Sequence, residues 1–192
     1  MDGMTAETYE PVARRNAGRW LLHRWPTALG LLAGGAALAA NVGRASLSIT
    51  VCVAVLCYLG AAALGRKWIA WVGVFAASLV PVAAALTGLP WWVGMAVVAA
   101  ALVVLGLVLG VPRRPLTAQF LATLAYGGLA VTALLLAPTI GLVLAGAVLV
   151  AHGLWDVVHY VRDAVVSRSL AEFCVALDVL LGGGVLVLAA VG

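Results

Sequence analysis

The sequence predicts an all-α integral membrane protein, a single bundle of seven transmembrane helices with a cytoplasmic N-terminus and an external C-terminus. Three observations lead to this prediction. The composition is 65% hydrophobic and 9% charged, apolar runs of helical length follow one another, and positive charges recur at alternate breaks between them. A soluble domain is about one quarter charged, so this chain has too little polar surface to be solvated on all sides.

The apolar runs define the expected elements in order. Each run has about 17–22 residues, which is enough to cross a hydrocarbon core of about 30 Å as a helix. The strands of a membrane barrel would alternate with period two, and these uniformly apolar runs do not. The breaks between them are rich in Gly, Pro and Arg, as expected of turns. We place the spans at residues 27–43, 47–64, 69–87, 91–111, 116–136, 139–160 and 169–190.

The positive charges set the expected orientation. With the N-terminus inside, every Lys and Arg except Arg44 falls on the cytoplasmic side, as the positive-inside rule requires. We therefore divide the chain into a basic cytoplasmic or interfacial segment, residues 1–25, and a seven-helix domain, residues 26–192. The first segment carries acidic residues and precedes a full-length span, so it is not expected to be a cleaved secretory signal. The net charge of +4 comes from this inner face and predicts no nucleic-acid partner.

The sixth predicted span contains ionisable residues that a membrane segment rarely carries. His152, Asp156 and His159 follow one another at i, i+4 and i+7 and so lie on one stripe of a helix. Each such group costs about 2.5–3.5 kcal/mol in hydrocarbon even on the lenient insertion scale. Ionisable residues that occur in a membrane span despite this cost indicate a functional site.

Two further polar stripes fall at the same expected depth near the inner leaflet. The seventh span places Cys174 and Asp178 on one face, and a short connection makes it the antiparallel neighbour of the sixth. The fifth span adds Gln119, Thr123 and Tyr126, again at i, i+4 and i+7. We expect these stripes to converge on one site.

The residue types of this site suit a metal ion. We interpret His152, Asp156, His159 and Asp178 as metal ligands, with Zn²⁺ as the divalent ion that imidazole and carboxylate ligands favour. A metal-bound water would then attack a lipid-like substrate.

A metal-free alternative uses Asp156 or Asp178 as a general acid or base, with His152 and Tyr126 orienting it. Such an acid would protonate an alkene or epoxide, as in a membrane terpene cyclase. In either case we expect four residues to line the site: Gln119, Thr123, Trp155 and Cys174.

Other cofactors are not expected. The two deep histidines share one helix, which does not suit haem ligated by two histidines across a bundle. No lysine lies within a predicted span to form a retinal Schiff base, and no glycine-rich loop suggests a nucleotide. The three cysteines and Tyr58 are expected to pack among their neighbours, and Gly182–Gly184 to permit close helix approach.

A seven-span chain with buried His and Asp residues near the cytoplasmic leaflet resembles, in architecture, the progestin/adiponectin receptor and alkaline ceramidase group of zinc amidohydrolases. That resemblance implies hydrolysis of a lipid amide. In that group the last helix carries H-x-x-x-H, whereas this chain has Cys174 and Asp178 there. No ligand set is carried over from the group.

The leading hypothesis is therefore an enzyme of the bacterial inner membrane that acts on a lipophilic substrate. Alternatives are a proton- or metal-ion-linked transporter, in which the same side chains form a relay, and an accessory subunit of a membrane complex. A structural alternative has Asp156 neutralised by a histidine and Asp178 bonded to Tyr126. Expected partners are membrane lipids, a lipophilic small molecule or ion, and a second copy or another subunit.

Overall fold

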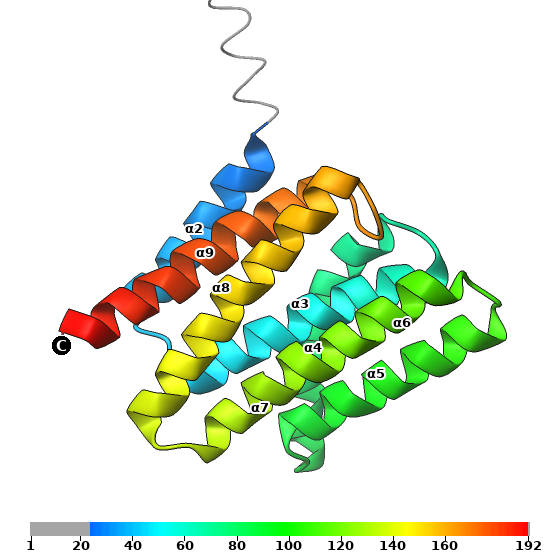
Figure 1. Ribbon diagram of the computed structural model, residues 1–192. Helices are drawn as coiled ribbons and strands as arrows, with labels where there is room; N and C mark the ends of the chain where they lie inside the picture. The colour runs from blue at the N-terminus through cyan, green and yellow to red at the C-terminus, as the bar shows by residue number, and fades with distance from the viewer. Residues whose placement is uncertain (1–23, 192) are drawn as a thin grey trace, which may run out of the picture.

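The computed structural model describes residues 24–191, which are almost entirely helical and contain no strand. Figure 1 shows the helices packed side by side in one bundle. Their bounds are α2 Trp25–Ala39, α3 Arg44–Leu64, α4 Ile69–Thr87, α5 Trp91–Val108, α6 Arg113–Ala122, the π-helix η1 Thr123–Gly127, α7 Gly128–Leu135, α8 Pro138–Arg162 and α9 Arg168–Val191.

The predicted spans coincide with these elements to within a few residues. Six helices in the described part of the chain are long and apolar enough to cross a membrane, counting α6, η1 and α7 as the single helix Arg113–Leu135. The chain is therefore a multi-pass membrane protein. The first predicted span corresponds to α2, which is apolar but has 15 residues and does not reach that length.

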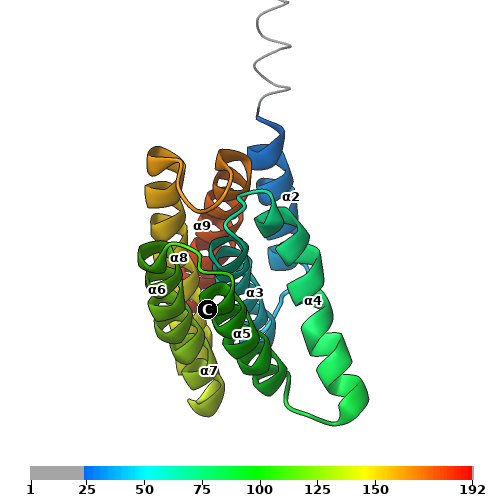
Figure 2. The same ribbon diagram turned by 90° about the vertical axis from the view of Figure 1, so that its right-hand side faces the viewer.

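Successive helices run in opposite directions. Figures 1 and 2 show the start of α2 and the α3–α4, α5–α6 and α8–α9 connections at one end of the bundle, with the remaining connections at the other. All described Lys and Arg residues except Arg44 belong to the first end, which we call the basic end. This agrees with the alternation of charge expected from the sequence.

Polar contacts join the helices at the basic end. Lys67 pairs with Asp163 at 3.0 Å, joining the α3–α4 and α8–α9 connections. Glu172 accepts hydrogen bonds from Arg24 and Thr27, which ties α9 to α2. Asp163 and Glu172 therefore both join separate elements of the chain.

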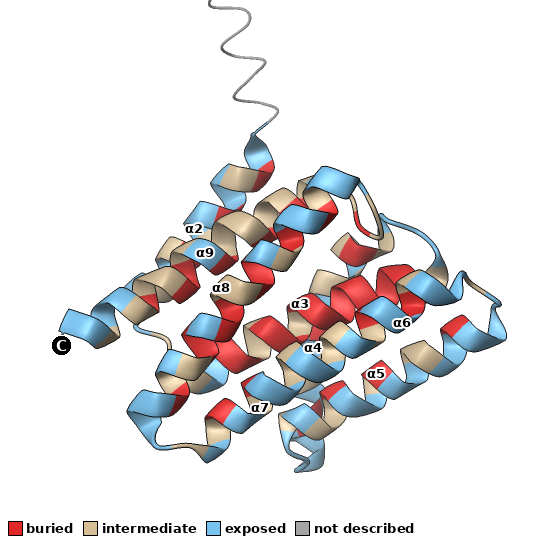
Figure 3. Ribbon diagram, in the orientation of Figure 1, coloured by how far each residue is buried: buried red, intermediate tan, exposed pale blue. Residues whose placement is uncertain are grey.

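Helix α3 forms the centre of the bundle. Most of its residues are buried, and it packs against α4, α5, α6, η1, α7 and α8. The outer faces of the surrounding helices are exposed and apolar (Figure 3), with side chains such as Phe75, Leu86 and Leu135 pointing away from the core. In water this surface would be an aggregation hazard, but it matches the hydrocarbon of a bilayer.

Small residues bring α9 close to its two neighbours. A Cβ atom on Gly182 of α9 would lie 2.6 Å from the backbone oxygen of Gly146 on α8. On the other side, Gly30 of α2 lies directly against the backbone of Phe173. These contacts hold α2, α9 and α8 in one tightly packed layer, as small residues commonly do in membrane bundles.

The predicted N-terminal segment lies mostly outside the described residues. Residues 1–23 carry most of its charges, so its interfacial position remains a prediction. Within the described part, Trp25 stacks on Trp71 with ring centroids 5.5 Å apart. Trp68 and Trp92 are exposed and stand at opposite ends of the bundle, as expected of aromatic belts.

Candidate functional site

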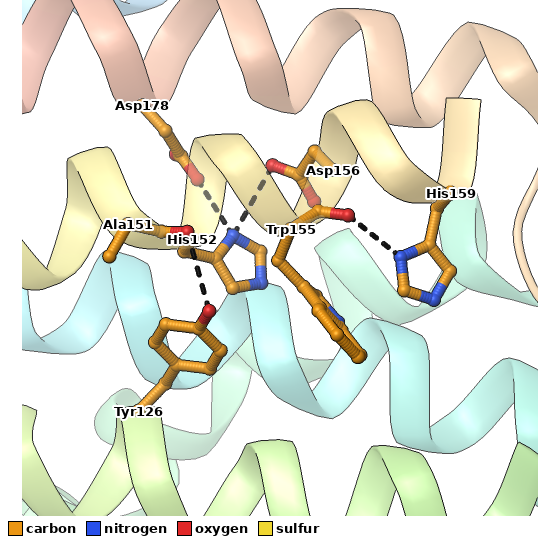
Figure 4. Close-up of polar contacts among 7 residues, drawn as sticks. All are labelled: Tyr126, Ala151, His152, Trp155, Asp156, His159 and Asp178. Carbon is orange, nitrogen blue, oxygen red and sulfur yellow. Dashed lines mark hydrogen bonds and ion pairs between the residues drawn. The ribbon is translucent and has the colours of Figure 1, made fainter. Parts of the chain in front are cut away.

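Three ionisable side chains meet between α8 and α9 (Figure 4). The Nδ1 atom of His152 lies 2.8 Å from an oxygen of Asp178 and 3.3 Å from an oxygen of Asp156. All three side chains are at most 1% exposed. We call these residues the His/Asp group. One possible ligand atom from each lies within 4.8 Å of the others, so the group is compact enough to hold a metal ion.

Helix geometry and close packing create the group. His152 and Asp156 are one turn apart on α8 and therefore share a face. Gly153 lies against Asp178 and Val179, since a Cβ atom there would be 3.4 Å from the Cβ atom of Asp178. The absence of a side chain at Gly153 lets α9 approach until Asp178 reaches His152.

The group is incompletely hydrogen-bonded. Within the described residues, neither carboxylate oxygen of Asp156 has a hydrogen-bond partner, and neither does the Nε2 atom of His152. Nδ1 points toward the two carboxylates, whereas Nε2 points away from them (Figure 4). Buried polar atoms are normally paired, so these atoms lack interactions that a bound species would supply.

Tyr58 of α3 belongs to this site, although its position in the sequence predicted only packing among its neighbours. Its ring meets His152 edge-on with centroids 5.6 Å apart and meets His159 in the same way at 4.9 Å. Its hydroxyl is buried with no hydrogen-bond partner among the described residues, and it interacts electrostatically with Asp156. The sequence offered one signal for this residue: Tyr58 is the one tyrosine of α3 and lies well inside that apolar span.

His159 does not join the His/Asp group. Its Nδ1 lies 2.9 Å from the Trp155 carbonyl oxygen, which only accepts, so Nδ1 donates. Its Nε2 lies 2.9 Å from the Gln119 amide nitrogen, which donates. Both ring nitrogens are therefore in use and the imidazole is neutral. Of the four residues expected to be metal ligands, His152, Asp156 and Asp178 meet in one group, and His159 lies outside it.

The fifth predicted span reaches the site through an irregular helix. The π-helix Thr123–Gly127 interrupts it, and such insertions are frequent at functional sites. Tyr126 lies with its ring 5.3 Å from that of His152 and donates to the Ala151 carbonyl at 3.3 Å (Figure 4). The structural alternative expected a bond between Tyr126 and Asp178, but the Tyr126 hydroxyl is bonded to the Ala151 carbonyl instead. Thr123 donates to the Gln119 carbonyl at 2.8 Å and presents no free hydroxyl.

The remaining predicted lining residues divide between two places. Trp155 meets the ring of His159 edge-on with centroids 4.9 Å apart, and its indole N–H has no partner in residues 24–191. Cys174 is buried in a cluster with Cys57 and Tyr58. Both Cys174 and Asp178 line a cavity of about 200 Å³ between α9 and helices α3 and α4.

Comparisons with protein-family models, with curated proteins and with solved structures find no match to this chain.

Proposed function

We propose that this protein is a membrane-embedded enzyme that holds a divalent metal ion, with Zn²⁺ favoured, at His152, Asp156 and Asp178, and acts on a lipophilic substrate. Asp156 is the observation that favours a bound cation. Its carboxylate is fully buried, and neither oxygen makes a well-formed hydrogen bond among the described residues. One oxygen lies 3.3 Å from His152 Nδ1, but that nitrogen lies closer to Asp178, at 2.8 Å. A buried carboxylate that is so weakly paired is costly, and a metal ion would remove that cost.

Charge balance supports a divalent ion in particular. Two carboxylates carry two negative charges and a neutral imidazole carries none, so one divalent cation makes the group neutral. Neutrality matters because a net charge in hydrocarbon is expensive. The alternative way to reach neutrality is to place two protons on the three side chains.

The ligand spacing supports the same proposal. The distances from His152 Nδ1 to the two carboxylate oxygens are 2.8 and 3.3 Å, close to the ~3.3 Å that separates two ligands on a tetrahedral Zn²⁺. Three protein ligands leave a fourth position for water or substrate, which is typical of catalytic rather than structural zinc.

The number of membrane crossings and the sides of the two termini are also part of this proposal. We infer that all seven helices cross the cytoplasmic membrane, with the N-terminus inside and the C-terminus outside. The basic end would then face the cytoplasm, in keeping with the positive-inside rule. The His/Asp group lies ten residues from the basic end of α9, or about 15 Å at 1.5 Å per residue.

A proton-linked transporter is the second candidate, and one contact favours it. The single atom His152 Nδ1 lies within reach of both Asp156 and Asp178. An imidazole between two carboxylates can pass a proton from one to the other, as proton relays in membrane helices do. In this case the group would hold protons and no metal.

Elemental analysis tests the proposal directly. The protein is purified in detergent without chelator, supplied with Zn²⁺, and compared with its Asp156→Asn and His152→Ala variants. We expect near-stoichiometric zinc in the parent and its loss in both variants. His159→Ala is the control, because it removes an imidazole that we place outside the group. A parent that stays metal-free and instead moves protons in vesicles would establish the transporter.

A further inference from the structure

A cavity connects the His/Asp group to the membrane-facing surface. It lies between α9 on one side and α3 and α4 on the other, and we call it the side cavity. Ser78 on α4 is exposed at its outer side, whereas Ala54, Cys174 and Asp178 are buried at its inner side. The complete lining is Ile49, Thr50, Val53, Ala54, Cys57, Val74, Ser78, Phe173, Cys174, Leu177 and Asp178.

The wall of the side cavity is effectively apolar until Asp178 is reached. The hydroxyl of Thr50 donates to the Ser46 carbonyl at 3.0 Å, and that of Ser78 donates to the Val74 carbonyl at 2.7 Å. Both donors are therefore occupied by their own helices. A ligand in the cavity therefore meets hydrocarbon surface, the thiols of Cys57 and Cys174, and the carboxylate of Asp178, which accepts hydrogen bonds.

The size and depth of the side cavity restrict what enters. Its volume of about 200 Å³ is below the ~300–1,000 Å³ of pockets for drug-sized ligands, so it suits a single narrow chain. Asp178 lies about 15 Å along α9 from the basic end, deep in the hydrocarbon core. A phosphate or another charged head group would have to leave the interface to reach it, at a cost of several kcal/mol.

We propose that the side cavity is the lateral entrance for a neutral lipid alcohol, an unbranched or isoprenoid chain whose hydroxyl reaches Asp178. This inference rests on the proposed enzymatic function, for which it names the substrate class. A hydroxyl is uncharged, donates to a carboxylate, and crosses hydrocarbon at far lower cost than a phosphate. The molecule enters sideways from the bilayer and does not pass through either end of the bundle.

Photo-crosslinking in phosphatidylcholine vesicles tests this entrance. One probe is a long-chain alcohol with a diazirine close to its hydroxyl, and the other is a phosphatidylcholine with a diazirine in its acyl chain. We expect the alcohol to label residues of the side cavity on α4 and α9. The phospholipid is expected to label the outer faces of the helices.

Two variants of α4 provide the matched comparison. Ser78→Phe fills the mouth of the side cavity, and Ala83→Phe adds the same ring to an exposed position of α4 that does not line it. We expect labelling of the cavity by the alcohol to be lost in Ser78→Phe and retained in Ala83→Phe. Equal labelling in both variants, or equal labelling of the cavity by both probes, would overturn the inference.

The same samples separate this inference from the proposed function. Ser78 lies outside the metal-binding group, so Ser78→Phe is expected to keep its zinc. Stoichiometric zinc without labelling of the cavity would leave the metal site standing and reject the entrance. Cavity labelling without zinc in any sample would reject the metal-dependent function and support a lipid site alone.

Discussion

At the scale of the residue, the distinctive feature is a set of buried polar atoms that are not all paired. His152 and Asp178 are bonded at 2.8 Å, while Asp156 and Tyr58 are left without hydrogen bonds among the described residues. Tyr58 carries a donor and Asp156 two acceptors, and they interact across the interface between α3 and α8. Tyr58 is therefore placed to orient the Asp156 carboxylate when a ligand occupies the group.

Removal of the Tyr58 hydroxyl is expected to weaken zinc binding with little effect on stability. Residues that orient a metal ligand typically contribute roughly 10–100-fold to metal affinity, and Tyr58→Phe keeps the ring contacts with both histidines. Zinc titration followed by competition with a chelator measures the change. Tyr126→Phe is the matched control, because its hydroxyl donates to the Ala151 backbone. An equal loss of affinity in both variants would argue against this role for Tyr58.

His159 provides the opposite case, a buried histidine with a structural role. His159→Ala is expected to lower the free energy of unfolding by about 1–3 kcal/mol, since it leaves the buried Gln119 amide without its partner. The zinc content of the folded protein should be unchanged. Thermal unfolding in detergent and elemental analysis check the two parts, and a loss of zinc from well-folded protein would return His159 to the ligand set.

At the scale of the element, glycine determines whether the site forms. The approach of α8 and α9 depends on Gly146, Gly153 and Gly182, where a side chain would meet the neighbouring helix. The π-helix Thr123–Gly127 is a second local backbone feature that shapes the site. It contains Tyr126, whose ring meets that of His152 edge-on.

The packing of α8 on α9 can be tested with two adjacent glycines. Gly182→Ala would place a Cβ atom 2.6 Å from the Gly146 oxygen, whereas at Gly183 no described atom lies within 4 Å of the added carbon. We expect Gly182→Ala to destabilise the protein by about 1–3 kcal/mol, as overpacking does, and to reduce zinc affinity by separating His152 from Asp178. Gly183→Ala should change neither quantity. Similar unfolding temperatures for the two variants would contradict this packing.

At the scale of the whole molecule, one central helix and one apolar outer surface organise the chain. The buried α3 supports the other helices, and the exposed outer faces (Figure 3) carry large apolar side chains that match lipid. Whether α2 crosses the membrane decides the side on which each terminus lies. It has only 15 residues, about 22 Å of helix, yet it packs closely along α9.

A topology experiment decides this point. Cysteine is introduced at each end of the bundle with Arg66→Cys or Leu89→Cys, and affinity tags mark the two termini. We expect the N-terminal tag to be accessible from the same side as position 66, which is the cytoplasm. The C-terminal tag should share the side of position 89, because seven crossings bring the chain to the opposite face. Both tags on one side would show that α2 does not span the membrane.

The helical class, the approximate bounds of the helices and their alternation can all be predicted from the amino-acid sequence. These follow from local composition, since each apolar run is long enough to be a helix wherever it packs. The sequence also indicated His152, Asp156 and Asp178, because ionisable groups in hydrocarbon stand out by their cost. The ionisable residues of the candidate site can therefore be identified without knowledge of their contacts.

Which polar residues meet depends on the packing of the helices and could not be predicted from the sequence. His159 shares a helical stripe with His152, yet its two ring nitrogens are bonded to Gln119 and the Trp155 carbonyl. Tyr58, an ordinary tyrosine by its local sequence, lies between the two histidines. Helical spacing assigns a face to each side chain, but partners depend on how closely the backbones approach. That approach is determined by glycines on facing helices, which the spacing of residues on one helix does not reveal.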